Sequence, residues 1–160
     1  MIIKVRSTII LLLLANVLRS QDTLNLEDMF VRKDFLILQS TKDYQAALAT
    51  AKKVSLSMKM TLDLRGLAPN KESGLTFSKA VCQEDELDYP SYFARGRDDG
   101  IYVSIEYSDA YPAFAKGYYI VVAASGSKDE HDMQATYKKI KAYNKDAYFK
   151  SSKVYMGCMH

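Results

Sequence analysis

The residues best suited to chemistry gather in one segment, Asp88 to Tyr111, where aromatic and charged side chains alternate. The candidate contact residues are Tyr89, Tyr92, Phe93, Arg95, Arg97, Tyr102, Tyr107 and Tyr111. Flat aromatic faces beside arginine and carboxylate groups are what a carbohydrate-binding or protein-binding surface uses, because tyrosine supplies a large contact area at low entropy cost. The opposing interpretation is that the rings pack this segment onto a sheet while its charges pair with one another in solvent.

Two histidines, His131 and His160, occur in the chain. The acidic neighbours of His131, which are Asp129, Glu130 and Asp132, could serve as metal ligands. Carboxylates in a first helical turn are also expected from the helix dipole alone, and we favour this ordinary role. The sequence therefore predicts no metal site and no cofactor.

The chain carries no familiar catalytic pattern. Its sequence contains no Cys–His pairing, nucleophile elbow, Gly-rich phosphate loop or paired-cysteine zinc spacing. We therefore expect a protein that is not an enzyme. An unrecognised hydrolase is the alternative, because carboxylates such as Asp63 and Glu106 could meet only in the fold.

The elements that would position these residues form two similar units. In the first, Phe35 to Leu38 is a continuous apolar run that predicts a buried strand. Thr41 can then cap a helix, whose apolar positions at helical spacing are Tyr44, Ala47, Leu48, Ala51 and Val54. Residues 58–64 alternate between apolar and polar side chains, which predicts a second strand with Met58, Met60, Leu62 and Leu64 on one face.

The second unit has the same order. Residues 118–124 form an aromatic and β-branched strand, and Ser127 with Glu130 predicts a capping box that opens a helix. The apolar stripe of this helix is Met133, Tyr137 and Ile140. Residues 146–155 alternate again and predict the last strand, with Ala147, Phe149 and Val154 facing inward.

Two strand–helix–strand units predict an α+β fold, a ferredoxin-like two-layer sandwich with a mostly antiparallel sheet and both helices on one face. Residues 21–33 would be an N-terminal arm, and residues 34–160 a single domain. Between the units, residues 66–116 would form an insertion. It has strand signals at 75–78 and 101–107, so it is expected to extend the sheet or to add a hairpin.

This order of elements resembles the SPOR domain (sporulation-related repeat), a bacterial cell-envelope module. Residues 117–130, GYYIVVAASGSKDE, resemble the aromatic strand, small-residue turn and helix start of that family, and residues 34–41, DFLILQST, resemble the equivalent part of the other half. The resemblance covers residues 34–65 and 117–157, with the insertion between them. It implies a ferredoxin-like fold and the binding of peptidoglycan glycan strands through the sheet face.

The first twenty residues are typical of a cleavable signal peptide. Lys4 and Arg6 precede an apolar run that is too short to span a bilayer, and Ser20 with Gln21 is a plausible cleavage point. We therefore expect a periplasmic or secreted protein without stable membrane insertion after cleavage. Removal of residues 1–20 would take away three basic side chains and lower the formal charge from +3 to about zero, which argues against a nucleic-acid-binding protein.

Cys82 and Cys158 are an even pair in a chain expected to reach an oxidising compartment. They could form one disulfide, or they could be two separate buried thiols. A mature chain of about 140 residues can bury a sizeable core without such a bond.

These observations predict an exported, non-enzymatic binding module for peptidoglycan glycan or another cell-envelope component, with the insertion and the exposed sheet face as contact surface. The alternative, from a different class, is a periplasmic protein-binding inhibitor or immunity protein. Both would be small exported domains without catalytic residues.

Overall fold

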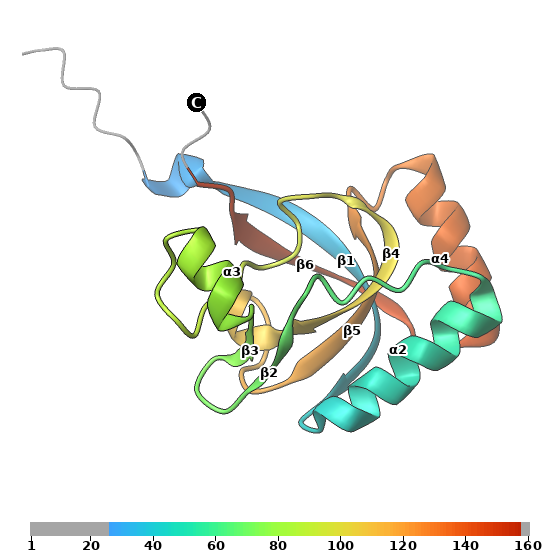
Figure 1. The fold of residues 1–160 in the computed structure, drawn as a ribbon. Coiled ribbons are helices and arrows are strands. Elements are labelled where there is room, and N and C mark those ends of the chain that lie inside the picture. The colour runs from blue at the N-terminus through green and yellow to red at the C-terminus, as the bar shows by residue number, and fades with distance from the viewer. Residues whose placement is uncertain (1–25, 158–160) are drawn as a thin grey trace, which may run out of the picture.

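The computed structural model describes residues 26–157, so the predicted signal peptide, Cys158 and His160 lie outside the described residues. In chain order the elements are η1 (Leu26–Met29), β1 (Phe30–Thr41), α2 (Tyr44–Met58), β2 (Ala68–Asn70), β3 (Gly74–Thr76), α3 (Lys79–Glu84), β4 (Gly100–Tyr107), η2 (Ser108–Ala110), β5 (Tyr119–Gly126), α4 (His131–Tyr143) and β6 (Tyr148–Tyr155). Figure 1 shows α2 and α4 on the same side of the main sheet. Within the described part of the chain, no helix combines the length and apolar character needed to cross a membrane.

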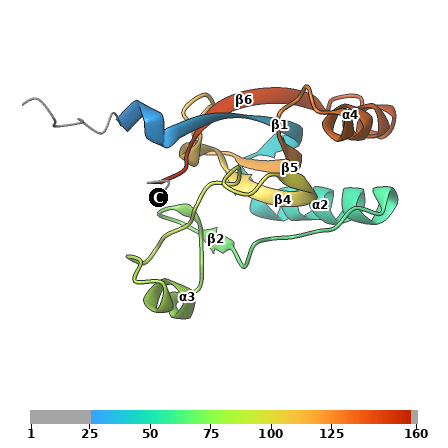
Figure 2. The same ribbon diagram turned by 90° about the horizontal axis from the view of Figure 1, so that it is seen from above.

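The main sheet has four strands in the order β4-β5-β1-β6, and every neighbouring pair is antiparallel. The chain enters this sheet as β1-α2-β4 and β5-α4-β6, so each helix connects two strands that are not neighbours. The predicted α+β two-layer sandwich with a ferredoxin-like arrangement is therefore confirmed. Figure 2 shows the strands in this order from β6 to β4.

The predicted strand at residues 58–64 is wrong. Helix α2 continues through Met58 and ends where Lys59 takes a left-handed φ of 53°, and within this segment only Leu62 forms a bridge, which is parallel to Val103. The apolar residues predicted to face inward, from Met58 to Leu64, do pack against the core that α2 and α4 cover, but residues 60–64 do so from an extended segment beside β4. Alternation of apolar and polar residues indicates an extended chain with one buried face, but it does not indicate which strand that chain pairs with. The pattern therefore could not distinguish this segment from a strand paired in a sheet.

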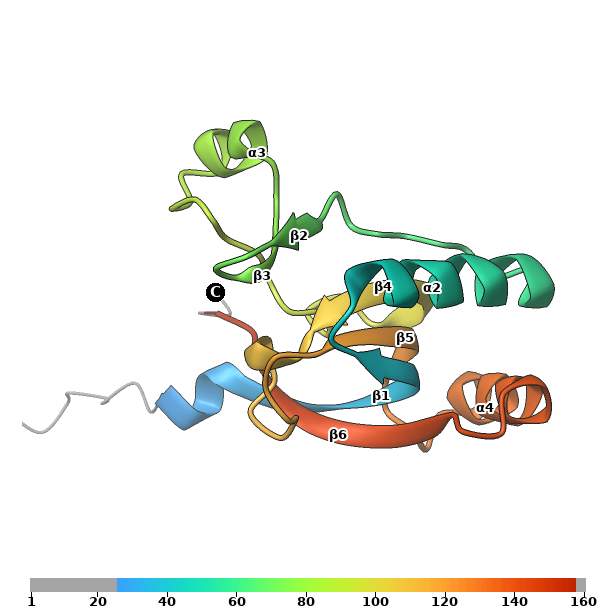
Figure 3. The ribbon, with the colours of Figure 1, turned by 90° about the horizontal axis from the view of Figure 1, so that it is seen from below.

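Strand β4 is the second strand of the first unit, in the place predicted for residues 58–64. The insertion therefore lies inside the first unit, between α2 and β4, and not between the two units at residues 66–116 as predicted. It contains the β2–β3 hairpin and α3. Figures 2 and 3 both show α3 and β2 away from β6, on the β4 side of the molecule, and Figure 3 shows β3 beside β2 there.

Both predicted helix caps are also wrong. Asp43 caps α2, because its side chain accepts the amide of Gln45 at 2.8 Å, whereas Thr41 is the last residue of β1. Helix α4 starts at His131, and no side-chain hydrogen bond caps it. The hydroxyl of Ser127 accepts the amide of Asp129 within the preceding turn, so no capping box forms.

Strand β1 begins at Phe30, so the last residues of the predicted arm belong to the sheet. They pair with the end of β6, from Phe30 opposite Tyr155 to Lys33 opposite Ser152. This long strand is the central partner of both β5 and β6, which explains why its middle, from Phe35 to Leu38, is buried on both faces.

The sheet has apolar residues on both faces. On one face α2 and α4 cover a core built from alternate residues of the strands, including Leu36, Leu38, Val103 and Val121. On the other face a smaller core contains Phe35, Ile37, Ile120, Val122 and Val154, covered by Tyr111 and Phe114 from the β4–β5 connection. This second face carries the polar and aromatic residues described next.

Candidate functional site

The structure divides the eight candidate contact residues into three groups. Arg95 and Tyr111 are buried, at 1% and 0% relative exposure. Tyr92, Tyr102 and Tyr107 are half-buried, and Tyr89, Phe93 and Arg97 are exposed. The eight residues therefore do not form one surface, and packing is the role of the buried pair.

The guanidinium of Arg95 lies under the sheet face opposite the helices, where five acceptors surround it. It donates to the carbonyl oxygens of Gly100, Tyr102 and Val122 and to the hydroxyls of Ser104 and Ser125, at 2.8–3.3 Å. Its central carbon lies 3.6 Å from the centre of the Tyr102 ring, which adds a cation–π contact. Burial lowers the pKa of Arg95. These bonds tie the segment before β4 to β4 and β5.

Glu106 is the buried anion of the same network. Its carboxylate accepts hydrogen bonds from Ser104 Oγ (2.9 Å), Arg65 Nη1 (2.9 Å), Tyr111 OH (3.1 Å) and the amide of Arg95 (3.2 Å). The Glu106 side chain has no exposed surface, so its carboxylate oxygens are bonded to these four donors and do not face solvent. Asp63 bonds to the amide of Arg65, so Arg65 links the two carboxylates that the sequence suggested as a pair.

The electrostatics of this network favour fixed protonation states. Burial alone would lower the pKa of Arg65, but the charge and hydrogen bond of Glu106 outweigh it and raise that pKa. Burial, followed by the negative charge of Glu106, raises the pKa of Tyr111 well above its ordinary value, and the same two causes raise the pKa of Tyr92. These shifts favour a charged Arg65 and neutral tyrosines, as is typical of a structural polar core.

The exposed candidates belong to the insertion. Arg97 lies over the ring of Phe93, with 5.4 Å between the guanidinium carbon and the ring centre, and Lys79 Nζ lies 5.2 Å from the centre of the Tyr89 ring. Phe77 packs at a tilt against Phe93, with ring centres 5.9 Å apart. We call these five residues the insertion patch.

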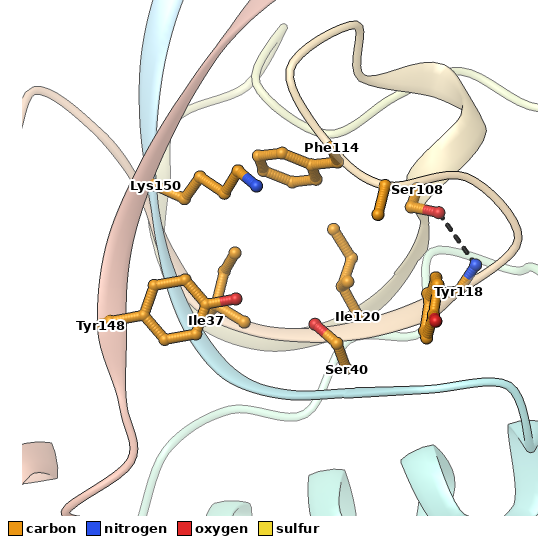
Figure 4. A pocket seen from close by; sticks show the side chains of 9 residues that line it. Ile37, Ser40, Ser108, Phe114, Tyr118, Ile120, Tyr148 and Lys150 are labelled. Carbon is orange, nitrogen blue, oxygen red and sulfur yellow. Dashed lines mark hydrogen bonds between the residues drawn. The ribbon is translucent and has the colours of Figure 1, made fainter.

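A pocket opens on the same sheet face, beside Phe114 and away from the buried Arg95. We call it the sheet-face pocket, and its volume is about 190 Å³. Its lining residues are Ile37, Ser40, Ser108, Phe114, Ala115, Tyr118, Ile120, Tyr148 and Lys150. Figure 4 shows these side chains around an open centre, with Ile37 and Ile120 on β1 and β5 and the aromatic rings around them.

The floor of the pocket is apolar and its rim carries donors. Ile37 and Ile120 are buried, while Tyr148 is 43% exposed. The hydroxyl of Ser108 is already bonded to the amide of Tyr118 at 2.9 Å (Figure 4). The ammonium of Lys150 lies 5.1 Å from the centre of the Phe114 ring. Such a mixture of apolar floor, aromatic walls and a few polar groups is typical of small-ligand sites.

No protein family, curated protein or solved structure matches this chain. The resemblance to the SPOR domain therefore stays a prediction from the residues.

Among the described residues, no group of three His, Cys, Asp or Glu side chains is placed to hold a metal ion. His131 Nδ1 lies 3.1 Å from Asp132 Oδ1, and both side chains are exposed at the start of α4. Cys82 is buried in α3, and because Cys158 lies outside the described residues, the disulfide remains a prediction.

Sequence reasoning missed the residues of the sheet-face pocket. Tyr148 and Lys150 stand in the predicted last strand, and the alternation that directs Ala147 and Phe149 toward the helices places these two on the opposite face. An aromatic and a basic residue two positions apart on a sheet face was the available signal. Their neighbours Phe114 and Tyr118 come from the β4–β5 connection, whose path the sequence does not specify.

Proposed function

We propose that this chain is an exported, non-enzymatic binding module whose ligand occupies the sheet-face pocket. The observation that carries the proposal is the convergence of three aromatic rings, Phe114, Tyr118 and Tyr148, around an open apolar floor on an otherwise covered sheet face. Phe114 is buried and Tyr118 half-buried, so Tyr148, at 43% exposure, is the ring with the most surface free to contact a ligand. A large ring at such a place contributes contact area without a large entropy cost.

A cell-envelope glycan is the ligand that we propose for this pocket. The C–H face of a sugar ring can pack on tyrosine or phenylalanine, while its hydroxyls can bond to polar groups at the rim such as Ser40 and Lys150. The resemblance to the SPOR domain supports this choice, because that family binds peptidoglycan glycan through its sheet face.

The buried network supports the non-enzymatic part of the proposal. Glu106 and Arg95 are the fully buried charged side chains of the described chain, and each is surrounded by hydrogen-bond partners of the protein itself. A general acid or base must reach a proton of the substrate. Neither side chain lines the sheet-face pocket.

Retention on purified cell-wall sacculi tests this function. We expect the wild-type protein to be retained and Tyr148→Ala to bind about tenfold more weakly, the equivalent of about 1.4 kcal/mol. Tyr155→Ala is the matched control, because Tyr155 is a similarly exposed tyrosine on the same strand and outside the pocket. Absence of wild-type retention, or equal loss in both variants, would contradict the proposal.

The insertion patch supports a second candidate, a protein-binding inhibitor. Tyr89 and Phe93 are 45% and 38% exposed, and Lys79 and Arg97 lie beside them. Tyrosine and arginine are enriched among residues that dominate protein interfaces. Under this candidate, envelope extracts yield one stoichiometric complex with the wild-type protein, and Phe93→Ala abolishes it while Tyr148→Ala does not.

A further inference from the structure

We propose that the ligand of the sheet-face pocket carries a carboxylate and that Lys150 binds it. This inference rests on the proposed function, because it names the chemical class of the ligand of the same pocket.

Lys150 is a half-buried lysine with no hydrogen-bond acceptor among the residues that the structure describes. Among the described residues three lysines are half-buried: Lys33, Lys141 and Lys150. Lys33 pairs with Asp99 at 2.5 Å, and Lys141 donates to the carbonyl of Ala147 at 2.8 Å. Within residues 26–157, the partner of the Lys150 ammonium is the face of the Phe114 ring, 5.1 Å from Nζ to the ring centre. An ammonium that lines an open pocket and has no acceptor among the described residues favours an anion in that pocket.

A second positive charge lies beside the pocket. Lys42 Nζ is 5.4 Å from the centre of the ring of Tyr118, which forms another wall. None of the nine lining residues is acidic. Lys150 is therefore the cation that lines the pocket, Lys42 adds positive charge next to one of its walls, and no lining carboxylate competes with the ligand for Lys150.

The lining favours a singly charged group on a ring-sized body. One lysine lines the pocket, and the remaining residues are apolar, aromatic or hydroxyl-bearing. A phosphate dianion is usually held by several cationic or amide donors, whereas one ammonium and a neighbouring hydroxyl suit a carboxylate. Two sources share this chemistry, an acidic sugar and an aromatic acid, and the experiment separates them.

The test is an NMR titration with two matched pairs of probes. Methyl β-D-glucuronide is compared with methyl β-D-glucoside, and phenylacetate with phenylacetamide, so that each acid has a neutral counterpart of nearly the same shape. We expect at least one acid to shift the amide signals of pocket residues and to bind tenfold or more tightly than its neutral partner. The pair that shows the difference identifies the source.

Three variants assign the effect to Lys150. Lys150→Met keeps the apolar stem and should remove the preference for the acid, while Lys150→Arg should keep most of it. Lys138→Met is the control for net charge, because Lys138 is exposed on α4, on the other side of the sheet. The comparison of acid and neutral probes in the wild-type protein does not depend on whether a variant folds.

The outcomes separate this inference from the proposed function. Equal binding of acid and neutral probes, or an acid preference unchanged in Lys150→Met, would overturn the carboxylate. Absence of shifts at pocket residues with either acid would also overturn it. The proposed binding function is tested separately from the carboxylate, by retention on sacculi and by the loss of that retention in Tyr148→Ala.

Discussion

Arg95 and Glu106 lie together in the interior with opposite charges, yet their charged groups meet only through Ser104. Ser104 Oγ accepts from Arg95 Nη1 at 2.9 Å and donates to Glu106 Oε1 at the same distance. The direct ion pair of Glu106 is with Arg65, at 2.9 Å. The Ser104 hydroxyl thus connects the buried guanidinium of Arg95 to the buried carboxylate of Glu106, and Arg65 also neutralises that carboxylate.

This arrangement fastens three segments to one sheet face. Arg65 comes from the segment after α2, Arg95 from the insertion before β4, and Tyr111 from the β4–β5 connection, and all three bond to Glu106 on β4. Buried polar networks are costly when a member is lost, because each remaining group keeps its desolvation penalty. Stability should therefore be sensitive to single changes here.

Glu106→Gln should destabilise the fold strongly. The amide has nearly the same shape, but it removes the negative charge beside Arg65 and Arg95 and turns an NH₂ group toward donors. Breaking a buried ion pair in this way costs about 3–5 kcal/mol. Urea unfolding followed by circular dichroism measures the loss. The control Glu72→Gln changes an exposed carboxylate in the β2–β3 turn and should cost less than about 0.5 kcal/mol.

Arg95→Lys should also destabilise the protein, although the charge is kept. A lysine ammonium cannot reach the spread of acceptors at Gly100, Tyr102 and Ser125, and it loses the flat stacking on the Tyr102 ring. Each buried acceptor left without a donor costs about 1–3 kcal/mol. Thermal unfolding compares this variant with Arg97→Lys, an exposed site where little change is expected. Equal melting temperatures for the two variants would disprove the structural role of Arg95.

Stability should fall above pH 10, partly through Tyr111. Burial and Glu106 raise the pKa of Tyr111 in the folded state, so above about pH 10 the folded chain holds a proton that the unfolded chain has lost. The free energy of unfolding then decreases as the pH rises, by about 1.4 kcal/mol per pH unit for this tyrosine. Urea unfolding between pH 9 and 11.5 should show a shallower decline in Tyr111→Phe than in the wild type. Identical slopes would count against a raised pKa.

Gly74→Ala should disrupt the contact between the β2–β3 hairpin and the sheet. Gly74 has a φ of 74°, and a Cβ atom there would lie 2.2 Å from Cδ1 of Tyr107, whose ring packs against Tyr119. Gly66→Ala is the matched control, since Gly66 has a φ of 65° with no atom within 4 Å of such a Cβ. The control should cost about 1–2 kcal/mol from backbone strain alone. Gly74→Ala should cost clearly more in the same unfolding assay.

Acid should weaken the protein through Asp34. Burial alone would raise the pKa of this carboxyl, but hydrogen bonds from Ser151 and the amide of Lys128, with the charges of Lys128 and Arg32, lower it below its ordinary value. The stabilisation is therefore present above about pH 4 and is lost as the pH falls through the lower pKa of the folded state. Asp34→Asn should reduce the loss of stability between pH 5 and 2, measured by urea unfolding. An unchanged pH profile would show that Asp34 does not contribute.

Local patterns were enough to predict most elements of the sandwich. The apolar run in β1, the helical spacing of apolar residues in α2 and the alternation in β6 are local signals. Each can be recognised from neighbouring residues, because burial of one face or of both faces of an element sets the pattern of its side chains. They failed at residues 58–64, because alternation shows that one face of an extended chain is buried without showing what it packs against. They also could not show that Arg95 is buried, since its five acceptors come from residues that only the fold brings to it.

The amino-acid sequence by itself determined the class of fold, the two helices on one face and the concentration of aromatic and charged residues before and within β4. Those properties depend on residues close together in the chain. The tertiary structure decided which of the residues became a buried network, which stayed exposed on the insertion, and where a pocket remained open. Those outcomes depend on the packing of distant segments, as when Lys150 of β6 meets Phe114 of the β4–β5 connection on the sheet face.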